Sequence, residues 1–149
     1  MNIKLLKTSL VLGVVVGAVA WYLIDSAQVK EAELKVNVYG DWVAAEGFCN
    51  TNVKGIDGVD ITNEFLLKNG KRIPIDKILI TEQETSIDRC DRGQIEYDFE
   101  FTLLPVNETY LHGSMADFQV IKSVHDSVVY FKMSQEFKKA YELFIVEPE

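Results

Sequence analysis

The chain has 149 residues, of which 48% are hydrophobic and only three are proline, so it can build a core and is neither repetitive nor low in complexity. Its net charge is −8, and residues 31–149 alone carry −10, from 12 Lys and Arg against 22 Asp and Glu. Such an acidic surface disfavours nucleic acid as a partner and leaves a basic protein or basic peptide, or a cation, unless the charge serves only solubility.

An uncharged apolar run occupies residues 9–24, after two lysines and no acid. This pattern is typical of a secretory signal or of a single membrane-spanning helix. Lys4 and Lys7 would lie at the cytoplasmic headgroups, with Trp21 and Tyr22 at the opposite interface. The run therefore predicts a cytoplasmic N-terminus and a C-terminal domain in the periplasm or outside the cell.

The alternative to an anchor is a signal peptide that is removed. Ala18-Val19-Ala20 fits the small-x-small cleavage rule, and cleavage near Ala20 would release the rest as a secreted protein. The new N-terminus would be strongly apolar, so we favour the uncleaved anchor. Gly13 and Gly17, four residues apart, have the spacing that lets membrane helices pack closely, although glycine is common in such helices in any case.

Cys49 and Cys90 are the only two cysteines, and both belong to the expected outer part. In an oxidising compartment an isolated pair of this kind predicts a disulfide bond. Two separate thiols would instead fit a cytoplasmic protein. The pair has no Cys-x-x-Cys spacing, so we expect no redox function.

Alternating apolar and polar residues predict a β domain, most clearly in residues 94–103, where every second side chain is apolar. Asn69-Gly70 predicts a hairpin turn. Ser134 and an apolar stripe at helical spacing predict a closing helix. The expected strands, apart from residues 94–103, lie at 34–43, 59–67, 72–75, 77–82, 85–87, 109–112, 118–121 and 127–133.

We therefore expect an all-β fold, a small antiparallel sandwich or barrel of 7–8 strands with a short C-terminal helix. A membrane or signal helix and linker at residues 1–30 would precede this domain at residues 31–149. Gly40-Asp41-Trp42 is similar to the Gly-x-Trp element of lipocalin-like barrels. The resemblance covers three residues and implies a barrel, without carrying over a ligand pocket.

Glu96, Asp98 and Glu100 alternate with the apolar residues of 94–103, so we expect them on one sheet face. This acidic stripe is a candidate partner-binding face, a candidate carboxylate pair or an ordinary solvated face. His112 and His125 are the only histidines, and their isolation does not indicate a metal site.

These patterns together predict a membrane-anchored accessory or interaction domain outside the cytoplasm. We expect no catalytic residue, cofactor or metal, and as partner either another protein or a second copy of the chain. One alternative is a lipocalin-like barrel that binds a small apolar ligand. The other is a hydrolase that uses the carboxylates of the acidic stripe or His112.

Overall fold

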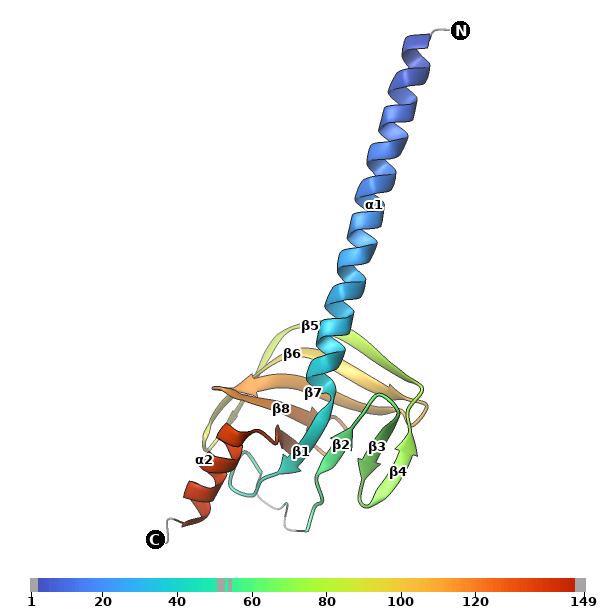
Figure 1. Cartoon of the computed structure of the whole chain (residues 1–149). Helices are drawn as coiled ribbons and strands as arrows, with labels where there is room; N and C mark the ends of the chain where they lie inside the picture. Colours follow the sequence, from blue (N-terminus) through green and yellow to red (C-terminus); the bar gives the residue numbers. More distant parts are fainter. Residues whose placement is uncertain (1–2, 51–52, 54, 147–149) are drawn as a thin grey trace. The chain divides into compact units, whose positions relative to one another are not determined.

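The computed structural model describes residues 3–50, 53 and 55–146, and side chains within these ranges from residue 14 to residue 143. The chain divides into two compact units, Met1–Val36 and Asn37–Glu149. The elements are α1 (Ile3–Val38), β1 (Gly40–Ala44), β2 (Val59–Ile61), β3 (Phe65–Lys68), β4 (Lys71–Pro74), β5 (Lys77–Cys90), β6 (Gly93–Leu104), β7 (Glu108–Met115), β8 (Phe118–Ser123), β9 (Val129–Lys132) and α2 (Gln135–Val146), as Figure 1 shows.

Helix α1 is longer than the sequence pattern predicts. The strand expected at residues 34–43 is wrong in its first half, because α1 continues to Val38 and β1 begins only at Gly40. Leu34 and Val38 are four residues apart, so they fit the helical period as well as the period of a strand. Glu31 and Lys35 also form an i,i+4 ion pair of 2.7 Å, which supports the helical choice.

The side chains along the middle of α1 are apolar and exposed. Between residues 14 and 24 the large hydrophobic residues keep 54–72% of their surface accessible. Within the described ranges, neither helix offers a stretch that is both long and apolar enough to cross a membrane.

In the part of the chain that the structure describes, nine antiparallel strands form one open sheet in the order β4-β3-β2-β1-β9-β8-β7-β6-β5. The expected all-β fold with a short closing helix is confirmed, but the count of 7–8 strands is wrong, and the expected sandwich of two sheets or closed barrel is a single open sheet. Residues 59–67 split into β2 and β3 because the Thr62 hydroxyl accepts the backbone N–H groups of Glu64 and Phe65, which turns the chain. Residues 77–82 and 85–87 instead join into the single strand β5.

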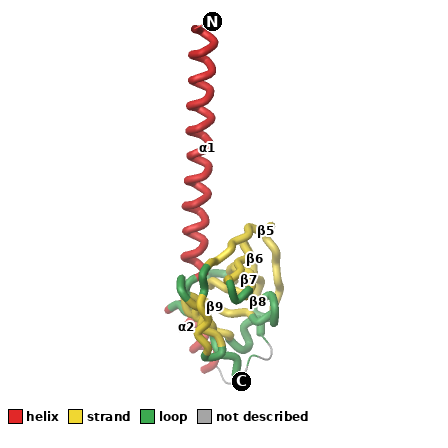
Figure 2. Tube along the Cα trace, turned by 90° about the vertical axis from the view of Figure 1, so that its right-hand side faces the viewer, coloured by secondary structure: helices red, strands yellow, loops and turns green. Residues whose placement is uncertain are grey.

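The sheet curls over on itself, and Figures 1 and 2 show its strongly curved strands. Four strands separate β3 from β7 in the sheet order. Lys68 of β3 nevertheless donates to the carboxylate of Glu108 on β7 over 3.0 Å. The concave face therefore encloses a core between the two halves of the sheet.

A β-bulge at Asp98 divides strand β6 between two cores. Tyr97 lies opposite Gly113 and Phe99 lies opposite His112. Tyr97 and Phe99 are two residues apart, so regular alternation would place their side chains on the same face of the sheet. Gly113 and His112 are consecutive, so they face opposite sides of the sheet, and their partners do too. The alternation of residues 94–103 thus changes faces at Asp98.

Each half of β6 supplies a different core. Phe99 and Phe101 point into the concave side, where Phe99 stacks on His112 and Phe101 stacks on Tyr110. The second core lies on the other face, under α2, and consists of Ala45, Phe48, Ile95, Tyr97, Met115, Val120, Val129, Phe131 and Phe137. We call this set the outer core.

Replacement of Gly113 by alanine is expected to lower the free energy of unfolding by about 1–3 kcal/mol. A Cβ at this position would overlap the carbonyl oxygen of Glu96 and lie 2.8 Å from the Cα of Tyr97, and backbone atoms at a bulge have little room to move. Urea unfolding of the full chain in mild detergent would measure the loss. Ser114→Ala, at the exposed neighbour on β7, is the matched control and should change little.

Candidate functional site

The bulge separates the residues of the expected acidic stripe. Glu96 pairs with Ser114 and Glu100 pairs with Leu111, and these two partners are three residues apart on β7. Residues at odd separation on a regular strand face opposite sides, so Glu96 and Glu100 lie on opposite faces of the sheet. The expectation of one acidic face is wrong, because the inserted residue reverses the alternation.

Each of these two carboxylates has its own amide partner. Gln94 donates to Glu96 over 3.2 Å, and Gln83 donates to Glu100 over 3.0 Å. Because they lie on opposite faces of the sheet, Glu96 and Glu100 do not form the carboxylate pair that a glycosidase-like hydrolase requires. Over the described ranges, no group of three or more His, Cys, Asp or Glu side chains lies close enough to hold a metal ion.

Asp98, the inserted residue, binds a buried histidine. The side chain of His112 is only 6% exposed and lies between Phe99, stacked at 4.4 Å, and Trp42, which meets it edge-on at 6.2 Å. Its Nδ1 lies 2.9 Å from a carboxylate oxygen of Asp98, and since a carboxylate oxygen accepts, Nδ1 is the donor of this hydrogen bond. His112 and Asp98 thus form a carboxylate–histidine pair at the bulge.

The hydrogen bond to Asp98 orients the His112 ring and leaves its second nitrogen, Nε2, without a hydrogen-bond partner among the described residues. The Nε2 atom is buried. A catalytic histidine uses this nitrogen toward a nucleophile, a substrate, a water or a metal. His125, the other histidine, is exposed in the β8–β9 connection and does not join the pair.

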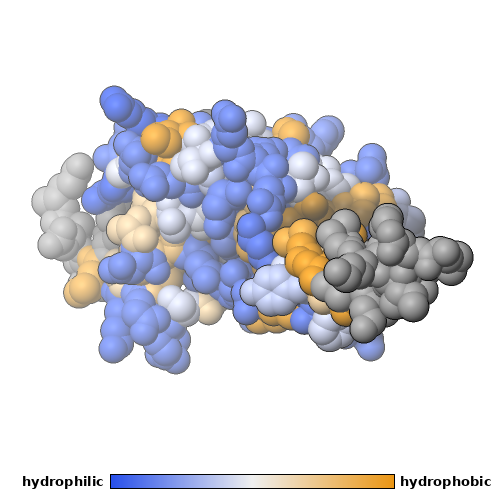
Figure 3. Space-filling model, turned by 90° about the horizontal axis from the view of Figure 1, so that it is seen from above, coloured by the Kyte–Doolittle hydropathy of each residue, from blue (hydrophilic) through white to orange (hydrophobic). Residues whose placement is uncertain are grey.

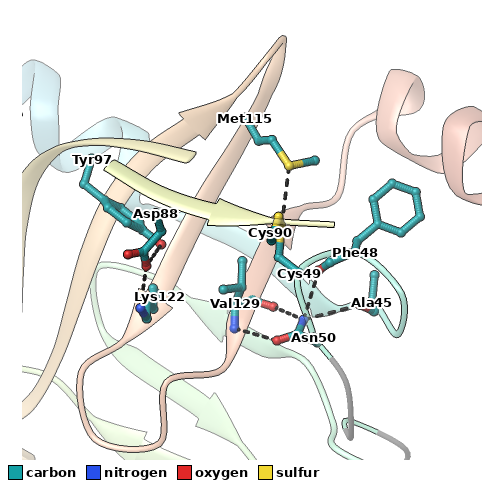
Figure 4. Close-up of a disulfide and its surroundings, with 10 residues drawn as sticks. All are labelled: Ala45, Phe48, Cys49, Asn50, Asp88, Cys90, Tyr97, Met115, Lys122 and Val129. Atoms are coloured by element: carbon teal, nitrogen blue, oxygen red, sulfur yellow. Dashed lines mark hydrogen bonds and ion pairs between the residues drawn. A yellow bond between two sulfur atoms is a disulfide. The ribbon is translucent and has the colours of Figure 1, made fainter. Parts of the chain in front are cut away.

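The two cysteines form the centre of a second cluster, which Figure 4 shows. Cys49 and Cys90, the pair expected to bridge, lie at disulfide distance with their Cα atoms 5.0 Å apart. Beside them, the Asn50 side chain donates to the carbonyl of Val129 over 2.8 Å and accepts its N–H over 3.0 Å. The loop after β1 is therefore attached to β5 through the cysteine pair and to β9 through the side-chain amide of Asn50.

A charged group lies at the edge of this cluster. Lys122 of β8 pairs with Asp88 of β5, and the hydroxyl of Tyr97 donates to the same carboxylate over 3.2 Å. The hydrogen bond from Lys122 holds the pKa of Asp88 below its ordinary value, despite partial burial. Burial, and then the charge of Asp88, raises the pKa of Tyr97. Asp88 therefore stabilises the fold above its ordinary pKa and loses this contribution as the pH falls.

A pair of carboxylates on β1 and β2 has the opposite effect on stability. Asp41 and Asp60 lie directly opposite each other, and burial, with the nearby Asp41, raises the pKa of Asp60. Because this pKa is higher in the folded chain, ionisation of Asp60 costs stability as the pH rises.

Asp60→Asn should therefore raise the free energy of unfolding at neutral pH by about 0.2–1 kcal/mol, the range for cross-strand charge pairs. The gain should disappear as the pH falls through the pKa of Asp60, which urea unfolding over a pH series would show. Asp57→Asn, in the exposed loop before β2, is the control. A gain that does not change with pH would contradict the prediction.

The residues expected at the membrane lie in α1. Trp21 and Tyr22 are 72% and 69% exposed, and a Cβ on Gly17 would meet no atom within 4 Å. The expectations for Lys4, Lys7 and Gly13 fall outside the described residues, because the structure describes side chains only from residue 14.

No protein-family model, no curated protein sequence and no solved structure matches this chain.

Proposed function

We propose that the chain is a membrane-tethered interaction domain, with α1 as its anchor and the β unit as an accessory module outside the cytoplasm. The main support for this proposal is the exposed apolar surface of α1. Val14, Val15 and Val16 are 65%, 56% and 62% exposed, and three consecutive helical residues point in three directions about 100° apart. A helix that is apolar on all sides requires cover by lipid or by protein.

The sequence around this surface supports lipid as the cover. The uncharged run starts at residue 9, before the first described side chain, and ends at residue 24. Trp21 and Tyr22 lie at the end of the run, where aromatic rings favour a membrane interface. The preceding Lys4 and Lys7 favour a cytoplasmic N-terminus.

The character of the β unit supports an interaction role outside the cytoplasm. Hydrophilic residues predominate on the face that Figure 3 shows, and residues 31–149 carry a net charge of −10. A cysteine pair at disulfide distance fits an oxidising compartment. A small, strongly acidic module held at a membrane is suited to contact other proteins by charge and shape.

Extraction of membranes with alkaline carbonate tests the anchor. The wild-type chain should remain in the membrane pellet, while the double variant Val16→Asp/Val19→Asp should pass into the supernatant, because charges within an apolar run oppose insertion. Val36→Asp, at an exposed valine beyond the run, is the matched control and should remain in the pellet. Release of the wild-type chain by carbonate would refute the anchor.

Thiol labelling of intact cells tests the side of the membrane. A membrane-impermeant maleimide should modify Cys49 and Cys90 only after an impermeant reductant has been added outside. Modification that requires cell lysis, with no need for a reductant, would place the β unit in the cytosol and contradict the proposal.

A further inference from the structure

We infer that helix α1 pairs with the α1 of a second copy of the chain, through a stripe of exposed apolar residues that repeats every seven positions. The stripe consists of Val15, Tyr22, Val29 and Val36, which are 56%, 69%, 53% and 65% exposed. Helix α1 is continuous across all four positions, as Figures 1 and 2 show. This inference rests on the proposed function, because it names a partner of the anchored chain and the face that binds it.

The spacing of this valine stripe is that of a helix that packs along another helix. Seven residues make nearly two turns, so an apolar residue at every seventh position follows one side of a helix that winds around a partner. Ala32 is three residues after Val29 and four before Val36, which completes the apolar a–d–a pattern of a coiled coil. One heptad earlier the position of Ala32 is taken by Asp25, so the apolar seam is interrupted there, at the end of the uncharged run.

Lipid does not cover the second half of the valine stripe. The uncharged run ends at residue 24, and Asp25, Glu33 and Lys35 follow it on the same helix. In the proposed arrangement the helix from residue 25 onward lies in water. Val29 and Val36 belong to this part, and burial of two valines on one stripe against a second helix would remove their apolar surface from water.

The part of α1 that is already covered near its end lies on the other side of the helix. Val38 is fully buried and Leu34 is half-buried. Each is two residues from Val36, which is about 200° around a helix of 3.6 residues per turn. Val36 therefore points away from the covered side, and Val29, one heptad earlier, points the same way.

The anchor makes a second copy the partner that fits. Every copy enters the membrane with the same orientation and to the same depth, so identical residues of two α1 helices lie at the same height. A parallel pair with two-fold symmetry then sets Val29 and Val36 of one chain against the same two residues of the other. Valine at position a is also suited to a parallel pair of helices.

The valine stripe differs from the face that Gly13 and Gly17 would use. Ile24 is seven residues after Gly17 and lies on the same side of the helix, whereas Val29 is about 120° away from this glycine. Pairing through the glycines would bring Ile24 to the contact, and pairing through the valine stripe brings Val29 there. The two faces therefore give opposite results in a cross-linking experiment.

Cysteine cross-linking of the full-length chain in native membranes, with a short bis-maleimide as the probe, tests the pairing. Val29→Cys and Val36→Cys should each give a cross-linked dimer, because identical residues meet across the seam. Ala27→Cys, about 200° around the helix from Val29, is the matched control and should give little dimer. The wild-type chain, with Cys49 and Cys90 closed as a pair, should give none.

A second measurement follows the affinity of the pair. Val29→Asp/Val36→Asp should weaken the dimer in mild detergent by about tenfold or more, because carboxylates would face each other across the seam. Analytical ultracentrifugation would measure the dissociation constant. Ala27→Asp places a carboxylate on the other side of the helix and should leave the dimer as strong as in the wild type.

Three results would overturn the inference: a monomeric wild-type chain, stronger cross-linking of Ile24→Cys than of Val29→Cys, or cross-linking of Val29→Cys mainly to another protein. Membrane extraction is independent of these results. A monomeric chain that stays in the carbonate pellet would lose the helix pair and keep the anchor. A dimer with the expected cross-linking pattern, in a chain that carbonate releases, would keep the helix pair and lose the anchor.

Discussion

Replacement of Phe137 by alanine is expected to lower the free energy of unfolding by about 3–5 kcal/mol, the range for a large aromatic side chain lost from a core. Phe137 is fully buried and its ring stacks on that of Phe131, with centroids 4.9 Å apart. Phe48 and Phe118 meet the same ring edge-on at 5.8 and 5.5 Å, and Tyr141 stacks at 5.9 Å. No other described side chain of α2 is buried as deeply, so alanine would remove the main contact between α2 and the sheet.

The loss should be visible in α2 itself, because a helix of 12 residues is marginal without tertiary packing. Urea unfolding of the full chain in mild detergent gives the free energy, and hydrogen exchange of the α2 amides shows whether the helix opens locally. Lys138→Ala, at the exposed next residue, is the matched control and should change stability by less than about 0.5 kcal/mol. A Phe137→Ala variant as stable as this control would show that α2 does not depend on the outer core.

Several elements were predictable because their signals are local. Asn69 and Gly70 adopt positive φ values of 53° and 70° and connect β3 to β4, as a tight hairpin turn requires. Ser134 caps α2 by accepting the backbone N–H of Phe137 over 3.0 Å. In both places a few adjacent residues determine the backbone, so the sequence pattern and the structure agree.

The bulge was not predictable, because it leaves the alternation of residues 94–103 unchanged in the sequence. Ile95, Tyr97, Phe99, Phe101 and Leu103 are all buried, as the pattern predicts. Period two, however, does not reveal that this sheet has a core on each face. An inserted residue reverses the faces, and only the register of β7 shows the reversal.

In the candidate sites too, the sequence predicts what depends on local signals and does not predict what depends on the pairing of distant segments. The cysteine pair follows from counting, since the chain has only two. The pairing of Asp98 with His112 depends on the register between β6 and β7, and the pairing of Asp88 with Lys122 joins strands that are not neighbours. The docking of α2 on the outer core is likewise not local, because the helix pattern predicts the helix without giving its position on the sheet.

Removal of the bond between Cys49 and Cys90, in the double variant Cys49→Ser/Cys90→Ser, is expected to lower the free energy of unfolding by about 4 kcal/mol. The two cysteines are 41 residues apart, and the chain-entropy model gives this figure for a loop of that length. The loss arises mainly in the unfolded chain, which becomes freer, so the native hydrogen bonds between Asn50 and Val129 should persist.

Urea unfolding of the oxidised wild type, the reduced wild type and the double variant would measure this effect. The reduced wild type and the double variant should agree within about 0.5 kcal/mol, because both lack the same constraint on the unfolded chain. Asn50→Ala in the oxidised chain separates the two attachments of the loop, and it should cost only about 1–3 kcal/mol, the range for a buried backbone group left without its partner. If the double variant were as stable as the oxidised wild type, the loop would be held by the Asn50 amide alone.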